Sequence, residues 1–129
     1  MKILCNNYSI ILNGINKKFS SVFVYKSNLT LSFLDVLIRE GIIRSYNISG
    51  NGNIEVFLKY YKGLSVLNNI RAISTSGQSV SYSILDMYRW KNSYSPLNSF
   101  LILNTSKGIF SSNELPYYKV GGQVLCIIN

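Results

Sequence analysis

Histidine is absent from the 129 residues of this chain, and its absence excludes several kinds of active site. Ser-His-Asp and Cys-His catalysis need an imidazole to transfer a proton, and the usual zinc sites use one as a ligand. The two cysteines, Cys5 and Cys126, lie too far apart in the sequence to form a CxxC metal knuckle. We therefore expect no metal site and no cofactor. We expect both cysteines to be reduced and buried, with one disulfide between them as the alternative.

Acidic residues are scarce as well. The five carboxylates are scattered between Asp35 and Glu114, and their spacing does not suggest the paired carboxylates of glycosidase-type acid–base chemistry. We therefore expect no enzymatic activity and no small-molecule substrate. A small enzyme that acts on RNA without histidine is kept as a rival hypothesis, which a turnover assay would settle.

Long hydrophobic runs are missing too. No apolar run approaches 18 residues, so no segment is expected to span a bilayer. The first residues, "MKILCNNYSIILNGINKK", show no small-residue cleavage site, and we predict no signal peptide. A protein that binds a membrane surface stays open as a rival, which binding to anionic vesicles but not to RNA would support.

What the chain does contain is basic and apolar. The chain has thirteen Lys and Arg residues and five Asp and Glu residues, which gives a net charge of +8. This charge favours a polyanionic partner such as nucleic acid. Hydrophobic residues make up 47% of the chain, enough to form a core. Asn, Ile, Tyr and Lys are abundant, and their codons are rich in A and T. That bias is typical of many organelle genomes and of some parasites.

The N-terminal half, residues 1–65, is predicted to have the order αβαββ. Apolar spacing predicts a helix over 4–16 and a second over 28–41 that ends at Gly41. Strands are predicted over 20–26, 42–48 and 54–61, and "SGNGN" joins the last two as a hairpin.

The C-terminal half, residues 66–129, is predicted to be mostly β with one short helix, so the fold class is α+β with two small α/β lobes. Strands are expected over 100–106 and 123–128, residues 65–74 fit a strand or a helix, and residues 87–99 look irregular. Ser111 and Glu114 match the S-x-x-E capping box, which predicts a helix starting at Ser112 and ending at Gly121 and Gly122.

A glycine-marked turn at Thr105–Gly108 is the first candidate site. It does not match a P-loop, because the lysine precedes the glycine. The hydroxyls of Thr105 and Ser106 and the ammonium of Lys107 are nevertheless groups that contact phosphates and 2′-OH groups. The alternative is a solvated turn followed by a helix cap.

Other candidates are aromatic or basic. Aromatic residues beside Arg89 and Lys91 could stack on bases or could cover a small sheet. They are Tyr82, Tyr88, Trp90 and Tyr94. Lys17 and Lys18, before the first predicted strand, could contact phosphates or lie in a solvated loop.

The segment "LILNTSKGIFSSNELPYYKVGGQVLC" (101–126) resembles the C-terminal signature of the bacterial-type small-subunit ribosomal protein eight family, which reads S-T-S-K-G, a short helix, G-G-E and a strand with a cysteine. "LDVLIREGII" (34–43), "LKYYKG" (58–63) and "ISTSG" (73–77) are similar to further family segments. The resemblance covers essentially the whole chain. It implies two α/β lobes and a structural role in binding the central domain of small-subunit rRNA.

The resemblance also implies an RNA-binding set in the C-terminal lobe. Carried over by position, it comprises Asn104, Thr105, Ser106, Lys107, Gly108, Gly121, Gly122 and Gln123, with Tyr82 as a weaker match. Lys17 and Lys18 of the N-terminal lobe remain candidates on the ground of their charge alone. The chain departs from the family pattern at Asn104, where the family has serine, and at Gln123, where it has an acidic residue. The family's first-helix arginines fall near Ile10 and Leu12.

From these observations we expect an organelle-encoded ribosomal protein of the small subunit. Its partners would be small-subunit rRNA and neighbouring small-subunit ribosomal proteins, with no membrane partner. The expected location is the mitochondrial matrix, with a plastid as the lesser alternative. A free-standing RNA-binding regulator or RNA chaperone built from the same lobes is the alternative function, which autoregulatory mRNA binding would reveal.

Overall fold

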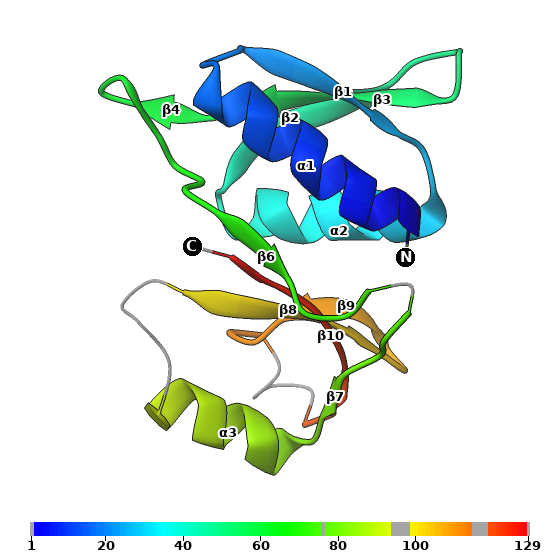
Figure 1. Ribbon diagram of the computed structural model, residues 1–129, viewed down its shortest axis with the longest axis vertical. Helices are drawn as coiled ribbons and strands as arrows, with labels where there is room; N and C mark the ends of the chain where they lie inside the picture. The colour runs from blue at the N-terminus through cyan, green and yellow to red at the C-terminus, as the bar shows by residue number, and fades with distance from the viewer. Residues whose placement is uncertain (1, 76, 94–98, 115–118, 129) are drawn as a thin grey trace. The chain divides into compact units, whose positions relative to one another are not determined.

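The computed structural model describes residues 2–75, 77–93, 99–114 and 119–128. The chain divides into two compact units, Met1–Ile70 and Arg71–Asn129, each with helices and antiparallel strands (Figure 1). The α+β class with two lobes is therefore confirmed. The sequence placed the boundary between the lobes after residue 65, a few residues before the division that the structure shows.

The first unit contains α1 (Lys2–Asn16), β1 (Ser21–Tyr25), α2 (Asn28–Arg39), β2 (Ile43–Ile48) and β3 (Asn53–Leu58). These strands form an antiparallel sheet in the order β1-β3-β2. The αβαββ order is confirmed. The strand predicted over 54–61 is split into β3 and β4 (Tyr60–Tyr61). After β4 the chain turns, and β5 (Leu64–Ser65) pairs with β4.

The two helices lie on the same side of this sheet (Figure 1). Alternate residues of the strands face them, so Val22, Val24 and Val56 are buried. The helices add further buried apolar side chains, including Leu4, Tyr8, Ile11, Phe33, Leu34 and Leu37. α2 begins where the Ser27 side chain accepts a hydrogen bond from the Thr30 N–H, and it stops at Gly41, whose φ is +76°.

The second sheet contains β6 (Ile70–Ala72), β10 (Gly122–Ile128), β8 (Phe100–Thr105) and β9 (Gly108–Ser111), in that order, and β7 (Ser81–Tyr82) also pairs with β10. Met87 of α3 (Ile84–Ser93) packs with Leu101, Leu103 and Val124 of the sheet. The segment 65–74, left open between strand and helix, begins at the last residue of β5 and contains the short strand β6. The predicted strands over 100–106 and 123–128 are confirmed as β8 and β10.

The helix of the second unit differs in position from the one that we expected. Residues 84–93 form α3, although most of them looked irregular in sequence. The missed signal is Ser83-Ile84-Leu85-Asp86, a capping box with Asp in place of Glu: the Ser83 N–H donates to the Asp86 carboxylate (3.1 Å), and the Asp86 N–H donates to the Ser83 hydroxyl (3.3 Å). These bonds, with Arg89 nearby, lower the pKa of Asp86.

The helix predicted from Ser112 is wrong in its described part. Residues 112–114 form a turn after β9, in which the Glu114 N–H donates to the Ser111 carbonyl and the Ser111 N–H donates to the Glu114 carboxylate. Ser111 is the last residue of β9 and pairs with Ile102 of β8. The chain therefore leaves a strand here and does not begin a helix. The rest of that prediction, residues 115–118, lies outside the described residues.

Replacing Ser83 with alanine should lower the free energy of unfolding by about 1 kcal/mol, because it removes the acceptor at the first turn of α3. Ser106→Ala is the matched control, since the Ser106 hydroxyl bonds to no other described residue, and its effect should stay within about 0.5 kcal/mol. Urea unfolding followed by circular dichroism measures both. Equal losses for the two variants would contradict the capping assignment.

Candidate nucleic-acid interface

The turn between β8 and β9 is closed by Thr105. Its hydroxyl donates to the Gly108 carbonyl (2.7 Å) and accepts from the Lys107 N–H (3.2 Å). Thr105 is buried, and Gly108 takes a φ of +125°, which a residue with a side chain rarely adopts. The turn therefore holds Ser106 and Lys107 outward on a backbone fixed by the threonine side chain.

Four strands of the second sheet end in one row of cross-strand partners. Tyr82 of β7 pairs with Gly122 of β10, Gly122 pairs with Thr105 of β8, and Thr105 pairs with Gly108 of β9. The next row begins with Ser81, Gln123 and Asn104 in the same way. The candidate residues of this lobe, dispersed between positions 82 and 123, are thus collected at one end of one sheet. We call them the sheet-end site, comprising Tyr82, Asn104–Gly108 and Gly121–Gln123.

The two adjacent glycines let backbones come together at this end. A Cβ on Gly122 would overlap the carbonyl oxygen of Asn104, and a Cβ on Gly121 would lie 2.5 Å from the carbonyl oxygen of Tyr82. Real Cβ contacts are essentially never this short, so both positions require glycine for packing within the protein. We expected the two glycines to end a helix. They instead let the chain at the start of β10 approach β7 and β8 closely.

The polar side chains around the row are available to a ligand. Asn104, Ser106 and Lys107 are exposed, and Gln123 is half-buried. None of these four side chains forms a hydrogen bond or ion pair with another residue that the structure describes. Asn104 and Gln123 are cross-strand partners, so their amides lie on the same face of the sheet. These four side chains supply one ammonium group, one hydroxyl and two amides, with no carboxylate among them.

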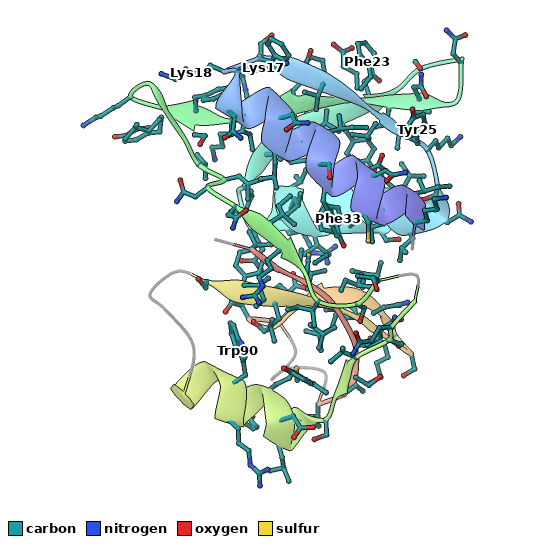
Figure 2. All side chains as sticks on the ribbon, viewed as in Figure 1. Lys17, Lys18, Phe23, Tyr25, Phe33 and Trp90 are labelled. Atoms are coloured by element: carbon teal, nitrogen blue, oxygen red, sulfur yellow. The ribbon has the colours of Figure 1, made fainter. Side chains whose placement is uncertain are left out.

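The aromatic candidates separate into two groups. Tyr82 and Trp90 pack against the core cluster of Met87, Leu101, Leu103 and Val124, and Figure 2 shows Trp90 extending from α3 toward the sheet. They therefore cover the sheet, which is one of the two roles expected for these aromatic residues, the other being stacking on bases. Tyr88 is 50% exposed on α3, and Tyr94 lies outside the described residues.

A hollow lies beside the row, and no sequence motif predicted it. Its volume is about 590 Å³, and Tyr82, Ser83, Leu85 and Gly121 are among the residues that line it. Leu85, in the first turn of α3, is 67% exposed. Only the meeting of β7, α3 and the glycine pair produces this hollow, so no local sequence pattern could have indicated it.

Lys17 and Lys18 belong to the other unit. They follow α1, and Lys18 takes a φ of +57° as the chain turns toward β1. Both side chains are exposed (Figure 2). The structure thus places the RNA-binding candidates on two separate units, with the sheet-end site in the second.

No helix among the described residues is long and apolar enough to cross a membrane. No group of three or more His, Cys, Asp and Glu residues in the described parts could hold a metal ion. Both cysteines are thiols rather than a disulfide: Cys126 is buried on β10, as expected, whereas Cys5 is only partly buried on α1.

Comparison with known proteins gives a family match along nearly all of the chain. Residues 3–129 match the family model described as ribosomal protein S8. The small ribosomal subunit protein uS8m of Acanthamoeba castellanii is 36% identical, with both chains covered in full. The uS8 proteins of Rhizobium rhizogenes and Borrelia garinii subsp. bavariensis are 34% and 37% identical over 92% and 90% of this chain, and over 89% and 88% of their own lengths.

Gly122→Ala should lower the free energy of unfolding by about 1–3 kcal/mol, because the added methyl group must displace the β8 backbone at Asn104. Gly77→Ala is the control, since no atom lies within 4 Å of its added Cβ. Chemical denaturation gives both values. A Gly122→Ala variant as stable as Gly77→Ala would contradict the close approach at the row.

Proposed function

The chain belongs to the ribosomal protein S8 family, and on this premise we propose that it is a structural constituent of a small ribosomal subunit that binds the central domain of the small-subunit rRNA. It would support the folding of that domain during assembly and contact neighbouring small-subunit proteins. The relatives named above are small ribosomal subunit proteins, uS8m in Acanthamoeba castellanii and uS8 in the other two organisms. None of their names denotes an enzyme.

The observation that carries the RNA-binding proposal is the set of unpaired polar side chains around the sheet-end row. The Lys107 ammonium is suited to a phosphate, and the Ser106 hydroxyl is suited to a 2′-OH group. Two amides, on Asn104 and Gln123, each offer donors and acceptors for a base edge or a ribose. The backbone that carries these side chains is already ordered in the sheet and its turn, so it loses little conformational entropy on binding, which favours specific recognition.

Thr105 has a different role in this proposal. Its hydroxyl is used inside the turn, where it holds the Lys107 N–H and the Gly108 carbonyl. We therefore assign Thr105 to positioning rather than to direct RNA contact. Gly121 and Gly122 act in the same way, since their missing side chains let β10 approach β7 and β8.

Gln123 changes the electrostatics of the site. A carboxylate at this position would repel the phosphates near Lys107, whereas the amide is neutral and can donate as well as accept. The cross-strand partner, Asn104, is also an amide. The substitution therefore keeps hydrogen bonding to RNA while removing one negative charge from the face of the sheet.

We place the protein in the mitochondrial ribosome. The composition is typical of an A/T-rich organelle genome, and the uS8m relative matches over its whole length. A plastid ribosome is the lesser alternative. Because the chain carries a net charge of +8, its binding to rRNA should weaken steeply as salt is raised.

Lys107→Glu combined with Ser106→Ala should abolish specific binding to a central-domain transcript while leaving the fold intact. The first change replaces a phosphate contact with a repulsion, and the second removes a hydroxyl that has no structural partner among the described residues. A filter-binding titration at several salt concentrations measures both the affinity and its salt dependence. The slope of log K against log salt concentration should become shallower by about one.

Lys2→Glu is the matched control for this experiment. It makes the same change in net charge on the exposed start of α1, in the other unit. Its affinity for the transcript should exceed that of the double variant by a wide margin. If both proteins lose affinity equally, RNA is held by net charge and the sheet-end site is not the specific contact.

A further inference from the structure

The sheet of the first unit is covered on one face only. Both helices lie on the same side of β1, β3 and β2, so the opposite face is left open (Figure 1). We call it the open face. Side chains alternate along a strand, and Val22, Val24 and Val56 are buried toward the helices, so their neighbours point to the open face. With their cross-strand partners they are Ser21, Phe23, Tyr25, Ser45, Asn47, Asn53, Glu55 and Phe57.

The pattern of β1 is that of a strand covered on both faces. In an antiparallel sheet with one face in water, the strands alternate between apolar and polar residues. Residues 22–25, Val-Phe-Val-Tyr, are instead apolar throughout. Phe23 and Tyr25 are nevertheless each 56% exposed, and Figure 2 shows the Phe23 ring on the side of β1 away from α1. The pattern therefore indicates that a partner covers the open face.

The aromatic side chains of the open face lie close together. The register places Ser21 opposite Phe57 and Phe23 opposite Glu55, so Phe57 and Phe23 are diagonal neighbours. Tyr25 follows Phe23 two positions along the same strand. Both kinds of neighbour are about 7 Å apart, which is within reach of aromatic side chains. Phe57, Phe23 and Tyr25 thus form one apolar stripe.

Glu55 sets the charge of the open face. It is the one charged residue among the eight, and it lies between Phe23 and Asn47 in a row of cross-strand partners. The Ser21 hydroxyl donates to one of its carboxylate oxygens (3.0 Å), and Glu55 forms no ion pair with another residue that the structure describes. The basic residues along these strands stand near their ends, at Lys26, Arg44 and Lys59. The centre of the open face therefore offers an unpaired carboxylate beside aromatic rings.

We propose that the open face is the docking surface for a short segment of a neighbouring small-subunit protein. Apolar side chains of that segment would pack on Phe23, Tyr25 and Phe57, and a lysine or arginine would pair with Glu55. The charge favours this partner over RNA, because a nucleotide stacked on Phe23 would bring its phosphates toward the Glu55 carboxylate. The inference rests on the proposed function in taking the neighbour to be a ribosomal protein.

The size of the open face limits what can bind. Three strands about 4.8 Å apart and about five residues long offer on the order of 250 Å², against about 800 Å² per partner in a stable interface. The face therefore suits a short segment and not a whole domain. Such a contact is weak alone, and it gains strength when one subunit holds both proteins, because binding is then intramolecular.

The edge of β1 is already closed at Tyr25. The buried Asn7 amide donates to the Tyr25 carbonyl (3.0 Å) and accepts from the Tyr25 N–H (3.0 Å), so it takes the place of a neighbouring strand. These bonds fix the backbone beneath the aromatic stripe before a partner arrives, which lowers the entropy lost on binding. We therefore expect the segment to lie on the face and not to add a strand at this end of β1.

The test is a photo-crosslink from the full-length chain with benzoylphenylalanine at position 23. The chain is rebound to small subunits from which high salt has removed the native protein, and the attached segment is sequenced after irradiation. We expect a segment of another small-subunit protein that contains apolar residues and a lysine or arginine. Attachment to RNA, attachment to a segment without a basic residue, or no attachment would each overturn the proposal.

Position 61 is the control for the crosslink. Tyr61 is 67% exposed in the same unit, but it belongs to β4, which lies outside this sheet. A probe at position 61 should not reach the same segment. If it attaches to that segment as efficiently as the probe at position 23, the open face is not the docking surface.

Variants test the two parts of the contact with the probe moved to position 25. Phe23→Ala should lower attachment at least about fivefold, because it removes a central aromatic contact. Glu55→Lys should lower it at least as much, because it repels the basic residue of the segment, whereas Tyr61→Ala should leave it unchanged. The urea midpoints should stay near that of the unmodified chain, since Phe23 is more than half exposed and Glu55 half-buried. Equal attachment for Glu55→Lys and the unmodified chain would overturn the basic partner.

The affinity for the central-domain transcript separates this inference from the proposed function. Phe23→Ala should bind the transcript like the unmodified chain, because the sheet-end site lies in the other unit. Parallel losses of transcript binding and of the protein crosslink would make the open face an RNA contact and overturn the proposal. An unmodified chain that does not bind the transcript would contradict the proposed function, and the crosslink would still decide what covers the open face.

Discussion

The close approach of β10 to its two neighbours is the constraint on which the candidate interface depends. Gly121 and Gly122 have no side chains to hold the strands apart, so the β10 backbone lies directly against Tyr82 of β7 and Asn104 of β8. This contact sets the register that aligns Tyr82, Gly122, Thr105 and Gly108 in one row. Without it, Lys107 and Gln123 would still be present, but they would not share one end of a sheet.

Much of this could be predicted from sequence, because the informative signals are local. Gly41 and the "SGNGN" turn marked the first unit, and the Thr105–Gly108 turn and the glycine pair marked the site. The position of the helix in the second unit could not be decided in the same way. Ser83–Asp86 and Ser111–Glu114 both match a capping pattern, and both form reciprocal contacts. What differs is that Ser111 belongs to a strand already paired with β8.

The roles of individual site residues depended on tertiary geometry. Thr105 looked like a ligand contact in sequence, yet its hydroxyl is used to close the turn, and this leaves Ser106 and Lys107 facing outward. Tyr82 looked like a stacking residue and packs on the core.

The most direct test of the account is to crosslink the purified protein to total RNA from its source at near-physiological salt and to sequence the attached RNA. We predict a single dominant peak in the central domain of a mitochondrial small-subunit rRNA. Crosslinks spread over many RNAs and lost with a modest rise in salt would contradict it, because they would show that only the net charge of +8 is recognised.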